Sequence, residues 1–287
     1  MPRRGSRSNF QQDANSEEKT KMRNLSYAKP TRKPPLTHFL SIPLGHNAAL
    51  CERLSTLTSD LLNASPSIPG LDPTIVVPGI RLHLTLGVMC LSDDMRNEPE
   101  TSSVAQDAQN ATLQNAITLL ECIRPRLMSL MENKPRRVSF QRLDIMSPNR
   151  GDLEKAHIMW IGPDVESEEG KRLQDFCELI HKEFFQAGLV VDEQRPLKLH
   201  CTVLNTKYRK PYRQKGTPFS FSAVLSSAAV SKLSYPGGSE GTVVPATKGP
   251  LAVEFGSWPV EEIQICAMQG KGPDGQYIRV GGISLTS

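Results

Sequence analysis

Apolar residues in the first half of the chain recur with periods that predict strands and helices in turn. The segment Thr37–Leu44 (THFLSIPL) has the short apolar run of a strand, and the spacing over Ala48–Leu62 is that of an amphipathic helix. Arg81–Leu91 predicts a second strand after a loop. A long helix is expected where apolar residues recur every three or four positions, at Leu113, Ile117, Leu120, Ile123 and Leu127.

The second half repeats this order of elements. Glu168–Ala187 is expected to be an amphipathic helix that ends at Gly188, and Phe219–Leu225 is expected to be a helical turn. Strands are expected at Arg137–Met146, His157–Gly162, Leu197–Leu204 and Val260–Met268, with Tyr277–Ile283 as a hairpin partner of the last. Mixed strands and helices in two similar halves indicate an α+β fold of two lobes.

Three polar stretches are expected to lie outside the core. Ser92–Asn110 reads as a surface loop, and Ser226–Pro250 reads as a loop insertion because Gly, Ser and Pro dominate it. Residues 1–35 offer too little apolar surface to offset the entropy of ordering, so we expect a disordered basic tail there. Residues 36–287 are then the folded domain.

Most of the basic excess lies in the tail. Residues 1–36 hold nine Lys and Arg against three Asp and Glu, whereas the remainder holds 25 basic and 27 acidic residues. The tail is compatible with a nuclear-import signal, a weak RNA tether or a solvated segment without a partner. Because the remainder is nearly neutral, its charge does not demand tight, sequence-blind binding of nucleic acid.

The cysteines and the hydropathy place the protein in a reducing compartment. The six cysteines occur singly, without a CxxC pair, as is typical of buried apolar residues rather than of a disulfide framework. No apolar run approaches the roughly 18 residues that span a bilayer, and the N-terminus has no signal-peptide pattern. We therefore expect a soluble protein that does not contact a membrane and is nuclear, cytoplasmic or both. A monomer is a separate expectation, which these patterns do not establish.

Two short segments share one pattern of residues. Arg81–Leu86 (RLHLTL) and Lys198–Val203 (KLHCTV) both read basic, Leu, His, apolar, Thr, apolar. Because alternate side chains of a strand face the same way, each segment would present a cation, an imidazole and a hydroxyl on one side. The candidate residues are Arg81, His83 and Thr85 in the first segment and Lys198, His200 and Thr202 in the second.

This trio of side chains suits a phosphate group. An imidazole exchanges a proton near neutral pH, and a threonine hydroxyl donates a hydrogen bond to a phosphate oxygen. Two copies of the trio supply one base and one acid for displacement at phosphorus, without a metal or another cofactor. The alternative is that each His-x-Thr is a structural histidine bonded to its neighbours.

Other reaction classes lack their sequence signatures. The chain has no HExxH pair for zinc, no GxSxG nucleophile elbow, no GxxxxGK[ST] loop and no GxGxxG fingerprint. A metal site, a serine hydrolase, a nucleoside-triphosphatase and a dinucleotide oxidoreductase are therefore unsupported.

The paired His-apolar-Thr-apolar segments resemble the signature of the two-histidine (2H) phosphoesterase superfamily, which includes 2′-5′ RNA ligase-like proteins. Within it the chain resembles one branch in particular, the A-kinase-anchoring-protein nuclear-ligand-recognition domain and the phosphoesterase domain of activating signal cointegrator 1 complex subunit 1. Phe39–Pro43, Lys198–Thr206 and Ile263–Met268 carry that likeness. We expect two departures from this branch: no KH-type RNA-binding domain before the phosphoesterase region, unlike in the cointegrator subunit, and an additional segment, Ser226–Pro250.

The resemblance implies a two-lobed fold with a pseudo-twofold axis and a central cleft between His83 and Thr85 on one wall and His200 and Thr202 on the other. It implies metal-independent cleavage of RNA-type phosphodiesters, either a 2′,3′-cyclic phosphate or the end of a 2′-5′ or 3′-5′ oligoribonucleotide. The alternative function is a non-catalytic module that binds a nucleotide monophosphate or an RNA end, with coactivator-complex proteins as partners.

A basic and aromatic cluster follows the second motif. Basic residues interleaved with aromatic ones can bind a phosphate backbone and stack a base, so Tyr208 and Arg209 are further candidates for substrate binding. An ordinary solvated loop is the alternative. The cluster comprises Lys207, Tyr208, Arg209, Lys210, Tyr212, Arg213 and Lys215.

Overall fold

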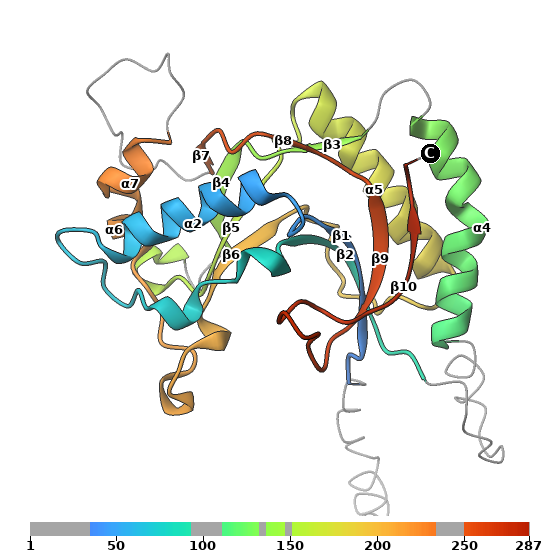
Figure 1. Ribbon diagram of the computed structural model, residues 1–287, viewed down its shortest axis with the longest axis horizontal. Coiled ribbons are helices and arrows are strands. Elements are labelled where there is room, and N and C mark those ends of the chain that lie inside the picture. The colour runs from blue at the N-terminus through green and yellow to red at the C-terminus, as the bar shows by residue number, and fades with distance from the viewer. Residues whose placement is uncertain (1–34, 93–110, 132–135, 147–150, 234–249, 287) are drawn as a thin grey trace, which may run out of the picture. The chain divides into compact units, whose positions relative to one another are not determined.

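Two antiparallel four-stranded sheets and the helices around them form the structure of residues 36–287 in this computed structural model (Figure 1). Contacts within the chain divide it into Met1–Pro35 and Leu36–Ser287. The first unit, apart from Pro35, lies outside the described residues, so the basic tail stays a prediction. The structure describes residues 35–92, 111–131, 136–146, 151–233 and 250–286.

The first sheet has the strand order β10-β9-β1-β2. Its central strand β1 pairs antiparallel with both β2 and β9, which joins the beginning of the domain to its end. The expected hairpin partner of the last long strand is confirmed, because β10 pairs antiparallel with β9. The strands are β1 (His38–Pro43), β2 (His83–Met89), β9 (Glu262–Ala267) and β10 (Arg279–Ser284).

The second sheet has the strand order β6-β5-β4-β7, and a separate two-stranded sheet pairs β3 with β8. The strands of the four-stranded sheet are β4 (Arg142–Ile145), β5 (Ile158–Gly162), β6 (Cys201–Asn205) and β7 (Leu251–Ala252), and the pair is β3 (Arg137–Ser139) and β8 (Ser257–Pro259). In each four-stranded sheet a motif strand, β2 or β6, lies at one edge.

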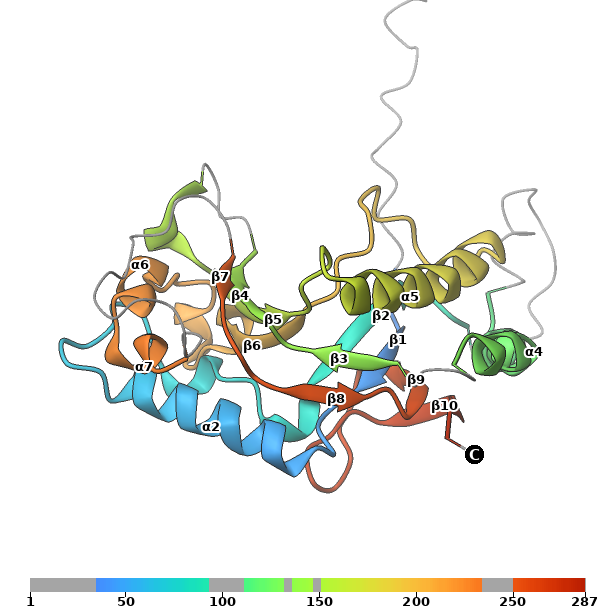
Figure 2. The same ribbon diagram turned by 90° about the horizontal axis from the view of Figure 1, so that it is seen from above.

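The helices form where apolar spacing and capping favour them. The α5 helix begins after Ser167, whose hydroxyl accepts a hydrogen bond from the Gly170 amide at 3.1 Å, and it ends before Gly188, which has a φ of +70°. Figure 2 shows α2 and α5 on opposite sides of the strands. In the described residues, the helices of at least four residues are α2 (Ala48–Leu62), α4 (Leu113–Met131), α5 (Glu168–Gln186), α6 (Phe221–Leu225) and α7 (Ala228–Ser231).

The two halves repeat one unit of strand, helix and antiparallel strand. In the first half α2 lies between β1 and β2 in the chain, and in the second half α5 lies between β5 and β6. The motif strands also share a β-bulge at the same place. Leu86 has no opposite residue in the β1–β2 ladder, and Val203 has none in the β5–β6 ladder; each lies three residues after a motif histidine. The expected similarity of the two halves is thus visible in their topology and register.

Three expectations for single elements were wrong. The expected strand Arg137–Met146 is divided at Phe140 and Gln141, because Phe140 is fully buried and its amide bonds to the Gly256 carbonyl instead of continuing a single ladder. Within the expected loop insertion Ser226–Pro250, α7 is helical and residues 234–249 lie outside the described part. All six cysteines are free, but Cys122 is exposed rather than buried.

The motif strands begin later than expected. Arg81 lies in a 3-10 turn, Gly79–Arg81, and Lys198 precedes β6, so neither cation belongs to the regular part of its strand. The expected loop Ser92–Asn110 lies outside the described residues apart from its two ends. Among the residues the structure describes, none of the helices combines the length and the apolar character required to cross a membrane.

Alternation along β1 separates a core face from an open face of the first sheet. Leu40 and Ile42 are fully buried and point into the core with Leu84 of β2. Ser41 and Pro43 lie opposite Thr85 and His83 in the β1–β2 ladder, so they share the other face with the first motif. The core strand β1 thereby holds the motif strand in register.

Truncation of Leu40 in this central strand should destabilise the domain. Leu40→Ala leaves a cavity in a fully buried position, so we expect a loss of about 2–5 kcal/mol in the free energy of unfolding, measured by urea denaturation. Leu130→Ala is the matched control, because Leu130 is 44% exposed on α4, and it should change stability by less than about 0.5 kcal/mol. Equal losses in the two variants would contradict this account of the core.

Candidate active site

The two motif strands lie side by side because each half of the domain bonds to the strand of the other half. The Val77 amide, which precedes the first motif, donates to the Val203 carbonyl of β6 at 2.9 Å. The Val191 amide, which precedes the second motif, donates to the Val88 carbonyl of β2 at 2.9 Å. These reciprocal bonds bring together two segments that are more than a hundred residues apart in the sequence.

The two imidazoles make the same local hydrogen bond. Nδ1 of His83 lies 2.7 Å from the carbonyl oxygen of Arg81, and Nδ1 of His200 lies 2.7 Å from that of Lys198. Since a carbonyl only accepts, each Nδ1 must carry the proton and donate it. The neutral rings therefore leave Nε2 with a lone pair that can accept a proton or a hydrogen bond.

Burial lowers the pKa of both motif histidines. Desolvation is the largest influence on His83, the bond to the Arg81 carbonyl opposes it, and the charge of His200 lowers the pKa further. For His200, desolvation is again the largest influence; Lys198 and Arg195 add to it, whereas the Lys198 carbonyl and Glu193 oppose it. The charge of His200 is the smallest of the three influences on the pKa of His83, behind burial and the bond to the Arg81 carbonyl.

Each threonine lies two residues after its histidine; His83 is the first residue of β2, whereas His200 directly precedes β6. Thr85 lies opposite Ser41 of β1, and Thr202 lies opposite Trp160 of β5. Thr85 and His200, one from each motif, line a cavity of about 240 Å³, which we call the His200 cavity. A residue of each motif therefore faces the same space.

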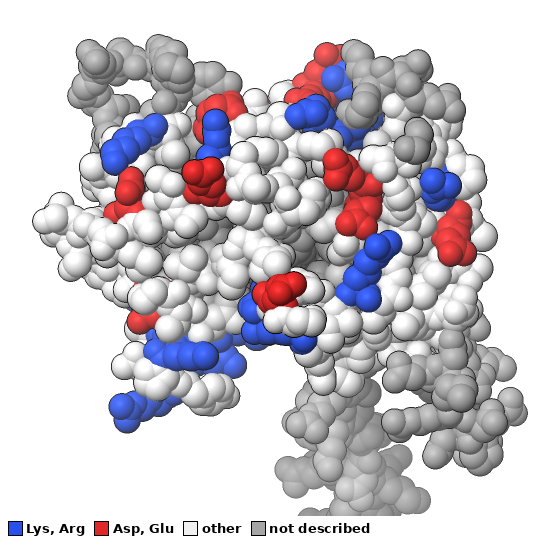
Figure 3. Space-filling view, viewed as in Figure 1, with Lys and Arg blue, Asp and Glu red and all other residues white. Residues whose placement is uncertain are grey.

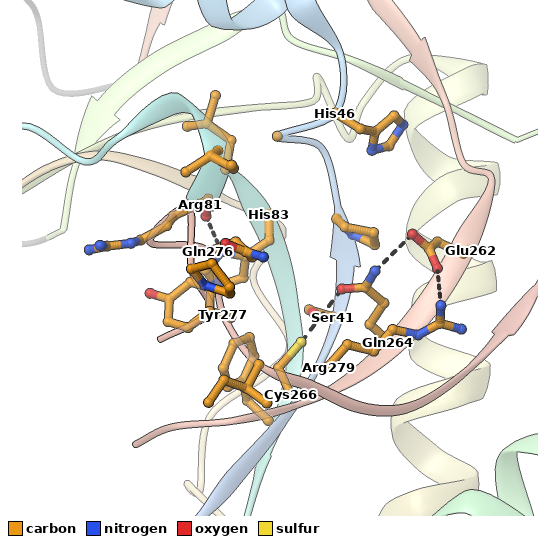
Figure 4. Close-up of a pocket in the computed structure, with 18 residues that line it drawn as sticks. Ser41, His46, Arg81, His83, Glu262, Gln264, Cys266, Gln276, Tyr277 and Arg279 are labelled. Carbon is orange, nitrogen blue, oxygen red and sulfur yellow. Dashed lines mark hydrogen bonds and ion pairs between the residues drawn. The ribbon is translucent and has the colours of Figure 1, made fainter. Parts of the chain in front are cut away.

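A larger cavity of about 540 Å³, the His83 cavity, is lined by Ser41, Pro43 and His83 on the open face of the first sheet (Figure 4). Phe39 and Tyr277 flank the imidazole there, with ring centroids 5.1 Å and 5.2 Å from that of His83. The two aromatic rings also contact each other edge to face at 4.9 Å. This aromatic wall explains why desolvation dominates the pKa of His83.

The opposite wall of the His83 cavity is polar. The Gln264 amide nitrogen donates to Glu262 at 2.8 Å, and Arg279 forms an ion pair with Glu262 at 3.5 Å (Figure 4). Cys266 donates its thiol hydrogen to the Gln264 side-chain oxygen at 3.5 Å. One wall of the cavity thus offers apolar rings, and the other offers an amide and charged groups.

The surroundings of His200 differ from those of His83. Trp160 contacts the His200 ring edge to face at 6.4 Å, and the Lys198 ammonium lies 4.2 Å above the centroid of the indole. Burial raises the pKa of Asp144 and lowers that of Lys198, and their mutual attraction opposes both shifts. The second half-site thus holds a cation beside the imidazole.

Two further predicted residues lie around the His83 cavity. The Arg81 guanidinium donates through Nε to the Gly275 carbonyl at 2.6 Å and so fastens the β9–β10 connection that carries Tyr277. Burial is the main reason that the pKa of Tyr277 is raised, and a hydrogen bond with Tyr208 raises it further. Tyr208, which follows the second motif, therefore lies against the first half-site.

The prediction that Arg209 binds substrate does not fit its position. Its side chain is buried, and its guanidinium donates to the carbonyls of Gly70 and Thr217. These bonds hold the loop after β6 against the segment that precedes Asp72. A carboxylate oxygen of Asp72 lies 3.9 Å from Nη1 of the guanidinium. The guanidinium is thus committed to the fold, and we leave Arg209 out of the site.

Sequence reasoning missed Phe39, Trp160 and Tyr277 as site residues. Phe39 alternates with Ser41 and Pro43, so the position of the first motif on the neighbouring strand was the available signal. Trp160 and Tyr277 reach the histidines only through sheet pairing and a hairpin connection. Among the described residues, no three His, Cys, Asp or Glu side chains form a cluster that could hold a metal ion.

Comparison with known proteins identifies the family. Residues 36–285 match the family model described as the AKAP7 2'5' RNA ligase-like domain. The chain belongs to this family. This match confirms the predicted resemblance to the 2′-5′ RNA ligase-like two-histidine phosphoesterases.

One curated relative shares part of this domain. The chain is 27% identical over 186 residues to activating signal cointegrator 1 complex subunit 1 of Mus musculus. The match covers 64% of this chain and 46% of the mouse protein, so the chain spans less than half the length of that relative.

Solved structures with a similar arrangement include bacterial proteins. E. coli LigT complexed with 3'-AMP matches with 14% identity and a TM-score of 0.42, over 88% of this chain and 99% of that chain. A phosphoesterase crystal structure matches with 14% identity and a TM-score of 0.41, over 88% and 99%. TT0787 of Thermus thermophilus matches with 14% identity and a TM-score of 0.36, over 87% and 98%.

The protonation of the two imidazoles can be measured directly. We expect His83 and His200 to be Nδ1–H tautomers when neutral and to titrate below their ordinary pKa of 6.5, because burial disfavours the charged form and each Nδ1 is engaged by a carbonyl. Long-range ¹H–¹⁵N NMR spectra recorded across a pH series give both quantities. An Nε2–H tautomer or a pKa above 6.5 at either ring would contradict the geometry described.

Proposed function

We propose that this protein is a metal-independent phosphodiesterase that cleaves RNA-type phosphodiesters with His83 and His200 as its acid–base pair. The observation that carries the proposal is the duplicated Nδ1–H bond to a backbone carbonyl. It makes both imidazoles Nδ1–H tautomers when neutral, which leaves each Nε2 available for proton transfer. Family membership supports phosphoesterase chemistry in general.

In the proposed reaction the two rings act in opposite protonation states. One neutral Nε2 takes the proton of the nucleophile, which is water for a 2′,3′-cyclic phosphate or a ribose hydroxyl for a linear linkage. The nucleophile forms a bond to phosphorus, the bond from phosphorus to the departing ribose oxygen breaks, and the other imidazole protonates that oxygen. Either histidine can take either role, depending on the direction of the reaction.

The neighbouring side chains would stabilise the charge that develops on the phosphate. Thr85 and Thr202 each lie two residues after a motif histidine and are proposed to donate hydrogen bonds to the non-bridging oxygens. The Lys198 ammonium lies beside His200 and adds a positive charge. Arg81 acts indirectly in this proposal, since its guanidinium holds the connection that carries Tyr277.

The second candidate function is a module that binds a nucleotide monophosphate or an RNA end without turnover. The lowered pKa of both histidines favours it, because the protonated acid becomes scarce at neutral pH. Under this hypothesis the protein would assemble with coactivator-complex proteins in the nucleus or the cytoplasm; the name of the mouse relative describes that protein as a complex subunit.

Loss of either imidazole should abolish turnover. His83→Ala and His200→Ala are each expected to lower kcat for a 2′,3′-cyclic nucleotide by about 10²–10⁴-fold in EDTA, because each removes one proton-transfer group. His157→Asn is the matched control, since the His157 ring bonds to the Thr206 hydroxyl at 3.0 Å rather than to the site. Binding of AMP to wild type without turnover of any cyclic or linear substrate would favour the second candidate.

The pH dependence should reflect the two lowered pKa values. The base must be neutral and the acid protonated, so kcat/KM rises through one imidazole pKa and falls through the other. Since both lie below 6.5, we expect a bell-shaped profile with its maximum below pH 6.5 and a decline above it. A profile that keeps rising through neutral and alkaline pH would argue against an imidazole acid.

A further inference from the structure

The loop after β6, residues 206–216, carries positive charge that the fold does not use. We call it the basic loop. Four of its cations are exposed, and none of the ion pairs found in the described part of the chain involves them. Figure 3 shows basic side chains gathered at the lower left, where this part of the chain projects in Figure 1. The four cations are Lys207, Lys210, Arg213 and Lys215.

The side chain of Tyr212, which lies among these cations in the chain, is exposed to solvent. Tyr212 is 80% exposed, the largest exposure among the exposed apolar and aromatic side chains of the described residues. The Lys215 ammonium lies 4.9 Å from the centroid of its ring. An exposed ring flanked by cations can stack a nucleobase while the cations meet the adjoining phosphates.

Hydrogen bonds attach the first residues of the basic loop to neighbouring segments of the domain. The Asn205 side chain accepts a hydrogen bond from the Lys207 amide at 2.9 Å, and the Thr74 hydroxyl accepts one from the Lys210 amide at 3.0 Å. Arg209 anchors the loop from inside through the carbonyls of Gly70 and Thr217. A loop that is already ordered loses less conformational entropy when a ligand binds.

Tyr208 joins the basic loop to the first half-site. It is 39% exposed, and its hydroxyl contributes to the raised pKa of Tyr277. Tyr277 in turn contacts the His83 ring, with centroids 5.2 Å apart. Tyr277 and Tyr208 therefore connect the His83 imidazole to the beginning of the basic loop. Tyr212 and three of the four cations follow Tyr208 in the chain.

We propose that the basic loop binds the continuation of a single-stranded oligoribonucleotide whose terminal phosphodiester lies between His83 and His200. The inference rests on the proposed function and makes its substrate an oligonucleotide rather than a mononucleotide. Alternating cations and exposed rings favour single-stranded nucleic acid, because an acidic polypeptide needs the charges alone. A duplex would keep its bases stacked and away from Tyr212.

Binding of labelled 2′-O-methyl oligouridylates tests the inference, because these strands lack the 2′-hydroxyl and are not cleaved by its attack. Fluorescence anisotropy with the full chain should show an affinity that rises with strand length beyond two nucleotides. The triple variant K207Q/R213Q/K215Q should weaken binding at least tenfold and reduce the slope of log Kd against log salt by about 2. Tyr212→Ala should weaken it about tenfold.

A matched variant and separate substrates make the outcomes distinguishable. R53Q/K171Q/K182Q removes three exposed cations elsewhere on the domain and should leave the affinity unchanged. Affinity independent of length, equal losses in both triple variants, or equal competition by polyglutamate would overturn the inference. Turnover of a 2′,3′-cyclic mononucleotide by wild type is measured separately, and its absence counts against the proposed function rather than against the basic loop.

Discussion

The site depends on a reciprocal exchange of backbone hydrogen bonds between the two halves of the domain. The segment before each motif bonds to the strand of the other motif, through Val77 to Val203 and through Val191 to Val88. Neither half can therefore present its histidine in the right place alone. Because main-chain amides and carbonyls make these bonds, the distance between the motif strands does not depend on the side chains that line them.

The two half-sites share a frame but differ in environment. Each imidazole is oriented by the carbonyl two residues earlier, yet His83 meets Phe39 and Tyr277, whereas His200 meets Trp160 beneath the Lys198 ammonium. The repeated unit thus gives both histidines the same local hydrogen bond, and the different side chains around them make their environments unequal. The acid–base reaction that we propose requires such an inequality at some stage, since it needs the two rings in opposite protonation states.

Local patterns predicted α2, α4, α5 and α6, most of the strands and the motifs, but not α7. Apolar spacing located α2, α4 and α5, because a helix is fixed by neighbours three and four residues away. The break at Phe140 was not predictable, since it depends on β8, which lies more than a hundred residues later. Arg209 shows the same limit. Its charge suggested a contact with substrate, whereas its guanidinium donates hydrogen bonds to the carbonyls of Gly70 and Thr217, which are distant in the sequence or on the far side of the loop.

The bulges at Leu86 and Val203 explain how one strand can serve two opposite surfaces. Thr85 and Gly87 are two residues apart, yet Thr85 pairs with Ser41 on the open face and Gly87 pairs with Leu40 on the core face. The same reversal separates Thr202 from Leu204, which pairs with the fully buried Met159. One surplus residue per strand switches the alternation. Deletion of this residue would turn the imidazole and the hydroxyl toward the interior, or else turn the apolar residues that follow toward water. The number of residues in each motif strand is therefore as constrained as their identity.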